Sequence, residues 1–168
     1  LSHLDLNFVD LTSKAAHVSD RQLRSHSYEW TDVCGKFFSP IGPEREDAIE
    51  LSSGEWFSAI CRDSVIALDL RVGDRFMAPG FDQYQYMPSQ LFSVLFAGAC
   101  WVGVPYAELH KQPSLLSDVA PQVLGVTPKL RDMIMALPEL DLSSCRLCFK
   151  DPLLPFDWQA WQEFGDRI

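Results

Sequence analysis

Residues 122–137 read QVLGVTPKLRDMIMAL. The apolar run Gln122–Val126 is typical of a buried parallel strand, and Lys129–Leu137 is typical of a helix. The same alternation of strand and helix continues on both sides of this unit. Strands that alternate with helices form βαβ units, so the sequence predicts an α/β domain with a mostly parallel sheet and helices on both faces.

Further strands are expected at 75–78, 100–104 and 146–150, and further helices at 55–68, 87–97, 114–119 and 156–164. Ser52 or Ser53 can cap the first of these helices, with Glu55 in its first turn. Residues 1–47 are polar and weakly patterned apart from a strand at 33–38. We therefore expect an irregular N-terminal segment, residues 1–47, packed on a domain formed by residues 48–168.

The composition excludes several classes of protein. The net charge of −9 gives a surface that repels nucleic acid and anionic membranes. No apolar run reaches the ~18 residues that span a bilayer, and residues 1–5 lack the layout of a signal peptide. The five cysteines are odd in number and scattered, which favours reduced thiols over a disulfide framework. We expect a cytoplasmic protein without nucleic-acid or membrane partners.

Five segments resemble motifs of the adenylate-forming enzymes, which include acyl-CoA ligases, luciferases and the adenylation domains of peptide synthetases. Leu70–Arg75 is similar to their GVxxGDRV turn and Leu95–Ala99 to their LLAGA segment. Ala120–Pro128 resembles VTVLxxVPxxL, Leu137–Arg146 resembles hPdLDLSSLR, and Trp161–Asp166 resembles FRERFG. The resemblance implies the fold of one sheet subdomain of these enzymes, which activate carboxylic acids with ATP and magnesium.

The motifs that hold ATP in this family are degenerate or missing. The stretch that matches the phosphate loop SSGTTGxPKG is residues 37–45, FFSPIGPER. Ser39 and Gly42 fit, and Arg45 stands in for the cationic lysine, whereas Glu44 repels phosphate. The glycine pair that flanks adenine is missing from residues 149–154, and the family's YGxTE motif, ribose-binding aspartate and catalytic lysine would follow Ile168. We expect no complete ATP site and no catalytic residue. ATP and magnesium are expected only as part of a complete ligase.

Two segments are candidates for a substrate site. Phe81, Asp82 and Tyr84 lie in a run that resembles the FDxS of peptide-synthetase adenylation domains, where the aspartate pairs with the ammonium group of the substrate. The resemblance implies that Asp82 serves an amine-bearing ligand beside an aromatic wall. Gly125 and Thr127 lie at the carboxyl end of a predicted strand, where open α/β sheets bind ligands. The alternatives are a solvated turn and a strand that simply leads into its helix.

Cys145 and Cys148 form a C-x-x-C on a predicted strand. Residues i and i+3 of a strand point to opposite faces, so we expect the two thiols to lie apart and to bind no metal. Trp158 and Trp161 are at i and i+3 of the last helix, and either pack in the core or mark a partner surface. The histidines form no metal-binding or catalytic pattern and are expected at the surface: His3, His17, His26 and His110.

These observations leave three hypotheses. The first is a partial, degenerate adenylate-forming domain that binds an acyl or aminoacyl ligand, or a carrier or partner protein, without ATP chemistry of its own. The second is a fragment of an active ligase whose remaining motifs lie in a longer or split polypeptide. The third is an unrelated small α/β interaction domain.

Overall fold

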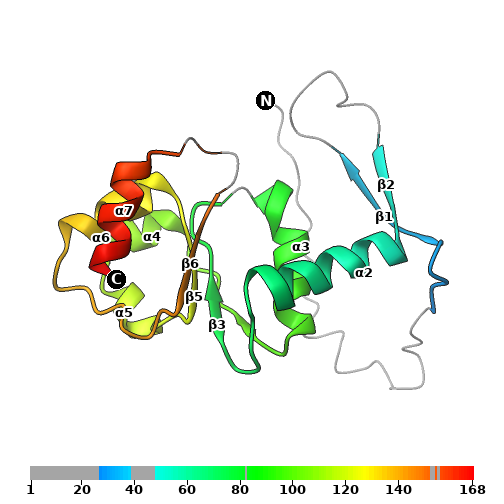
Figure 1. Ribbon diagram of the computed structural model, residues 1–168, viewed down its shortest axis with the longest axis horizontal. Coiled ribbons are helices and arrows are strands. Elements are labelled where there is room, and N and C mark those ends of the chain that lie inside the picture. The colour runs from blue at the N-terminus through cyan, green and yellow to red at the C-terminus, as the bar shows by residue number, and fades with distance from the viewer. Residues whose placement is uncertain (1–26, 39–47, 82, 152–153, 155) are drawn as a thin grey trace, which may run out of the picture.

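A computed structural model describes residues 27–38, 48–81, 83–151, 154 and 156–168 (Figure 1). In this part of the chain, none of the helices combines the length and the hydrophobicity that crossing a bilayer requires. Several of the positions singled out above lie outside the described residues: His3, His17, His26, Ser39, Gly42, Arg45 and Asp82.

The centre of the fold is a four-stranded sheet. Its spatial order is β4 (Cys100–Trp101), β3 (Arg75–Met77), β5 (Val123–Val126) and β6 (Leu147–Lys150). All three neighbouring pairs are parallel, which confirms the predicted sheet. β4 is shorter than expected, although Val102 continues the pairing by donating its N–H to the carbonyl of Phe76 at 2.9 Å.

Helices cover both faces of the sheet, as predicted (Figure 1). On one face lie α2 (Ser53–Cys61), the π-helical segment η1 (Arg62–Ala67) and α3 (Gln83–Phe96); on the other lie α4 (Tyr106–Lys111), α5 (Leu115–Val119), α6 (Pro128–Ala136) and α7 (Trp158–Arg167). Successive strand residues point to opposite faces. Phe76 and Val123 are therefore buried on the α3 side with Val94, whereas Met77 and Leu124 are buried among α4 to α7.

Four of the helices differ from the prediction. The sequence does not predict α4, and α7 begins at Trp158 and ends at Arg167 rather than covering 156–164. The other two are α3 and α2. α3 begins at Gln83 rather than near residue 87, and Pro88 lies inside it. Proline is common at the first helical position, so the sequence places the start of this helix too late. The helix expected at 55–68 is α-helical only to Cys61 and then widens into η1, where the N–H of Leu68 donates to the carbonyl of Asp63 at 3.0 Å.

A separate antiparallel hairpin is formed by β1 (Val33–Phe38) and β2 (Ala48–Ser52). β1 confirms the strand expected at 33–38. The sequence does not predict β2, because alanine and glutamate are poor strand formers. The hairpin joins residues on either side of the domain boundary expected at residue 48, and that boundary stays a prediction.

The start of α2 is fixed by a capping box. The Ser52 hydroxyl accepts a hydrogen bond from the Glu55 N–H at 3.3 Å, and the Glu55 carboxylate accepts one from the Ser52 N–H at 2.9 Å. We expect Ser52→Ala to lower the free energy of unfolding by about 1 kcal/mol, as measured by urea denaturation. Ser52→Asp should keep most of the wild-type stability, because aspartate can also cap a helix. An unchanged urea midpoint for Ser52→Ala would contradict this assignment.

The same box has a pH dependence with a definite sign. The hydrogen bond from the Ser52 N–H, followed by that from the Ser52 hydroxyl, lowers the pKa of the Glu55 carboxyl. A group with a lowered folded-state pKa stabilises the fold above its ordinary pKa of about 4.3, and loses that contribution as the pH falls through the folded-state value. The stability difference between wild type and Glu55→Gln should therefore close as the pH is lowered.

Candidate functional site

Two adjoining pockets lie where β3, β4 and β5 end. The first has a volume of about 390 Å³. It is lined by residues 78–81, which follow β3, by residues 101–106, which begin at the last residue of β4, and by Gln90 of α3. The second has a volume of about 360 Å³ and is lined by Gly80, Tyr106 and residues that follow β5 and β6. Because Gly80 and Tyr106 belong to both, we treat the pockets as one site, the carboxyl-edge crevice.

Gly80 brings the walls of the crevice together. Its φ of 82° is in the left-handed region that favours glycine. A Cβ atom at this position would lie 3.5 Å from Cγ2 of Thr127 and 3.8 Å from Cβ of Tyr106. The turn after β3 therefore packs directly against the residue that follows β5. Strand ends of a parallel sheet meet at one edge, which is where such sheets bind ligands.

An aromatic stack backs the first pocket. The ring of Phe76 stacks on Trp101 at 5.1 Å and on Phe149 at 5.7 Å between centroids. Phe81, which is 7% exposed, meets Phe149 edge-on at 5.3 Å. Phe81 and Trp101 both line the crevice. The wall at this point is therefore apolar and closely packed, which suits an aryl or acyl group.

The second pocket has a polar end. The hydroxyl of Thr127 accepts the N–H of Leu130 at 3.2 Å and caps α6, which begins at Pro128. Exposed Lys129 lies on the rim, and none of the ion pairs between described residues involves it. An amino end of a helix and a lysine both favour an anionic group. The crevice thus joins an apolar wall to a cationic rim.

Of the candidate site residues that the structure describes, some line the crevice and others do not. Phe81 and Thr127 line adjoining parts of the crevice, and their role in ligand binding stays a prediction. Gly125 is buried behind it: a Cβ there would lie 2.8 Å from Cβ of Ala78 and 2.9 Å from Cζ of Phe149. Tyr84 is in the first turn of α3 and not in a loop.

The sequence does not identify the other lining residues. Gln90, Trp101, Tyr106 and Lys129 come from three parts of the chain and lie outside the motifs quoted above, and only the fold brings them together. Gly80, which follows the strand expected at 75–78, was the available signal, because glycine in a loop after a strand often marks a close approach of backbone to a ligand.

Trp158 and Trp161 have different surroundings. Trp161 lies parallel to Phe156 at 6.4 Å, meets Phe164 edge-on at 5.6 Å, and has the Arg131 guanidinium 5.5 Å above its ring. Trp158 is 70% exposed. Of the two tryptophans, Trp161 therefore packs in the fold. The ring of Trp158 lies 5.6 Å from that of Phe156 between centroids, and a partner surface at Trp158 stays a prediction.

The expectation for Cys145 and Cys148 is wrong in its geometry. β6 begins only at Leu147, so Cys145 lies in the preceding turn and the alternation of a strand does not apply to the pair. The two Sγ atoms are 3.5 Å apart. Among the described residues, no group of three or more histidine, cysteine or acidic side chains could hold a metal ion. The absence of a bound metal stays a prediction.

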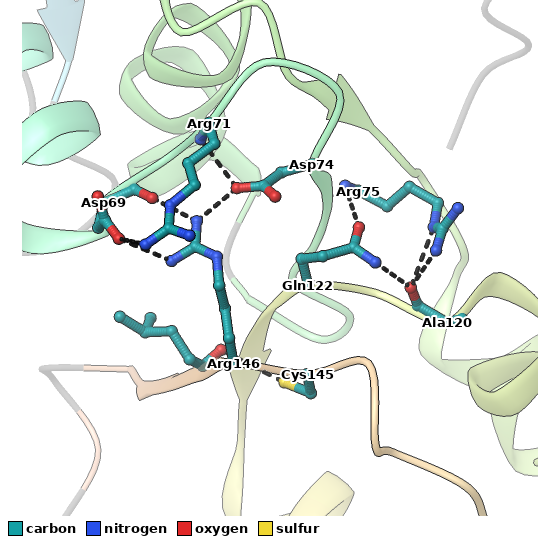
Figure 2. Close-up of polar contacts among 9 residues, drawn as sticks. Asp69, Arg71, Asp74, Arg75, Ala120, Gln122, Cys145 and Arg146 are labelled. Carbon is teal, nitrogen blue, oxygen red and sulfur yellow. Dashed lines mark hydrogen bonds and ion pairs between the residues drawn. The ribbon is translucent and has the colours of Figure 1, made fainter.

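Charged side chains brace the opposite, amino-terminal edge of the sheet (Figure 2). Arg146, just before β6, donates to Asp74 and also to Asp69, at 3.1 Å from the Asp69 carboxylate. Asp74 also accepts the N–H of Arg71 at 2.8 Å. This cluster joins the turn before β3 to the start of β6 and lies away from the crevice, so we assign it to stability.

A scan of the sequence against protein-family profiles and a search of curated proteins found no match. Among solved structures, the fold is similar to the inhibitor-bound N-terminal domain of FACL13 from Mycobacterium tuberculosis. The TM-score is 0.74 at 14% sequence identity, over 94% of this chain and 39% of that chain.

Two further structures are similar. The anthranilate CoA ligase AuaEII in complex with anthranoyl-AMP gives a TM-score of 0.66 at 22% identity, over 84% of this chain and 29% of that chain. The fatty acyl-adenylate ligase from L. pneumophila, in complex with acyl adenylate and pyrophosphate, gives a TM-score of 0.68 at 11% identity, over 87% of this chain and 27% of that chain. This chain thus spans well under half of each of these chains. The likeness confirms the expected α/β fold, which this chain shares with part of each of these ligases.

Proposed function

We propose that this chain is a ligase-like domain that binds a small, largely apolar carboxylic acid in the carboxyl-edge crevice and has no ATP chemistry of its own. The observation that carries the proposal is the crevice itself, in which the aromatic wall of Phe81 and Trp101 adjoins the cationic rim at Lys129. Cytoplasmic location and a carrier protein or synthase domain as partner belong to the same proposal.

The chemistry of the crevice matches an aryl or acyl acid. Each of its two pockets falls within the ~300–1,000 Å³ range of small-molecule sites. The ring or chain of the acid would lie against Phe81 and Trp101, with its carboxylate directed to Lys129 and the amino end of α6. Two of the structurally similar ligases hold an acyl or aryl adenylate, which contains the same kind of acid.

Nucleotide binding provides the first test. The segment that resembles a phosphate loop, residues 37–45, replaces most small donor residues by phenylalanine, proline and isoleucine, and the net charge of −9 repels an anionic nucleotide. We expect calorimetric titration with Mg-ATP to give no dissociation constant tighter than ~100 μM, which corresponds to about −5.5 kcal/mol. Tighter binding would contradict the absence of ATP chemistry.

The rival function is that of a fragment of an active ligase. It is favoured by the 27–39% of each similar structure that this chain spans. In that case a carboxylate reacts with ATP to give an acyl adenylate and pyrophosphate. Tight Mg-ATP binding, together with acid-dependent exchange of pyrophosphate into ATP, would favour this rival over the binding role.

Filling the mouth of the crevice should block the acid. Gly103 is exposed, and a Cβ there would make an ordinary contact with Trp101, 3.5 Å from Nε1. We expect Gly103→Leu to weaken binding of benzoate, anthranilate or octanoate at least tenfold in calorimetry, while leaving thermal unfolding unchanged. Gly165→Leu is the matched control, because a Cβ at Gly165 meets nothing within 4 Å and α7 does not line the crevice. Equal affinities for both variants and wild type would place the ligand elsewhere.

Amino acids belong in the same titration. Asp82 lies outside the described residues, and its expected pairing with an ammonium group stays a prediction. If the ligand is an amino acid, Asp82→Asn should weaken binding by about 1.5–3 kcal/mol, the worth of a charged hydrogen bond. If the ligand is a plain carboxylic acid, Asp82→Asn should leave its affinity unchanged or raise it slightly.

A further inference from the structure

Cys145 and Cys148 face each other across the start of β6. The N–H of Cys145 donates to the carbonyl of Leu142 at 2.8 Å, which closes a turn immediately before the strand. The Sγ atoms are 3.5 Å apart, and both side chains are half-buried. A disulfide needs an S–S distance of ~2 Å, so small side-chain rotations and a modest adjustment of the turn would bring the sulfurs into bonding range.

The two thiols are not equivalent. Cys148 is in β6, paired in register with Leu124 of the central strand, whereas Cys145 lies outside the strand, and its Sγ contacts the carbonyl of Leu147 at 3.4 Å. The hydrogen bond from Cys148 lowers the pKa of the Cys145 thiol, and the same contact raises the pKa of the Cys148 thiol. Cys145 is therefore the better nucleophile, and Cys148 is the thiol that reacts second.

We propose that Cys145 and Cys148 form an oxidation site, at which a peroxide converts the two thiols into a disulfide. The Cys145 thiolate attacks one oxygen of hydrogen peroxide, an S–O bond forms as the O–O bond breaks, and the departing hydroxide is protonated to water. Cys148 then attacks the sulfur of the Cys145 sulfenic acid, its proton leaves with the hydroxyl group as a second water, and the S–S bond closes. Two thiols and one peroxide thus give one disulfide and two waters.

Such a site agrees with reduced cysteines in the resting protein. Reversible disulfides in reducing compartments form mainly at redox-responsive thiols that lie close together. The other cysteines act as internal controls, since none of them is paired with a second cysteine among the described residues: Cys34, Cys61 and Cys100. Cys100 is the exposed one, so access alone would favour its oxidation over that of the pair.

The sequence offers a direct test in the unmodified chain. Trypsin cleaves after Arg131, Arg146 and Lys150, which puts Cys145 and Cys148 on separate peptides, 132–146 and 147–150. The protein is treated with hydrogen peroxide, and the monomeric fraction is alkylated under denaturing conditions, digested and analysed by mass spectrometry. We expect these two peptides to be joined by a disulfide that dithiothreitol releases, at a rate at least tenfold above the oxidation of Cys100.

Two variants give the order of the steps. In Cys148→Ser, whose hydroxyl keeps a donor near Cys145, dimedone should label a sulfenic acid at Cys145. In Cys145→Ser, Cys148 should stay largely unlabelled. The proposal is overturned if the wild-type peptides are not joined, if Cys100 reacts as fast as the pair, or if elemental analysis finds stoichiometric zinc that protects both thiols.

Discussion

Replacing Gly125 by valine is expected to lower the free energy of unfolding by about 2–3 kcal/mol, as is usual for overpacking a close-packed core. Gly125 is in the central strand β5, and a Cβ there would lie 2.8 Å from Cβ of Ala78 and 2.9 Å from Cζ of Phe149. Valine is a good strand former, so strand propensity alone would favour the change. A loss of stability therefore reports the steric conflict, and urea denaturation measures it.

The matched control, Gly165→Ala, is expected to lose no stability. Gly165 is in α7, where a Cβ meets nothing within 4 Å, and alanine is preferred over glycine in helices by about 0.5–1 kcal/mol. Gly165→Ala should therefore be neutral or stabilising. A Gly125→Val protein as stable as wild type would contradict the close packing of β5 against its neighbours.

Removing the Arg146 side chain is expected to have an effect of similar size. The Asp74 side chain is 9% exposed and that of Arg146 is 25% exposed, so Arg146→Leu leaves a nearly buried carboxylate without its cation. Breaking a fully buried pair costs about 3–5 kcal/mol, and the partial exposure of Arg146 reduces our expectation to about 2–3 kcal/mol.

Arg71 provides the comparison. Its side chain is 65% exposed and pairs with Asp69, which is 56% exposed, at 2.6 Å. Exposed pairs contribute less than about 1 kcal/mol, so Arg71→Leu should be nearly neutral and its effect should vanish in high salt. A loss for Arg146→Leu as small as that expected for Arg71→Leu would show that Asp74 does not depend on Arg146.

The sheet could be predicted because its strands leave a local signature. Val123–Val126 is buried on both faces and therefore apolar throughout, and the helix after it begins at Pro128 behind the capping residue Thr127. Likewise Ser52 and Glu55 fix the start of α2 by a contact three residues apart. In these cases the physical cause lies within a few residues of its effect.

The crevice and the cysteine pair could not be predicted in this way. Gln90 and Tyr106 line the same pocket only because the fold brings α3 and the segment after β4 together, and no local pattern of the sequence identifies either residue. The error for Cys145 came from counting it as a strand residue although β6 begins two residues later, at Leu147, and side-chain direction depends on that boundary. Pro88 similarly led to a predicted start of α3 that is too late.

The glycine amides provide the most direct test of the proposed acid site. In a ¹H–¹⁵N correlation spectrum titrated with benzoate, anthranilate and octanoate, at least one acid should shift the amides of Gly80 and Gly103 with a common saturation curve. The amides of Gly35, in β1, and Gly165, in α7, should stay in place, since neither lines the crevice. If Gly80 and Gly103 do not shift for any acid, or shift no more than Gly35 and Gly165, the carboxyl-edge crevice is not a carboxylic acid site.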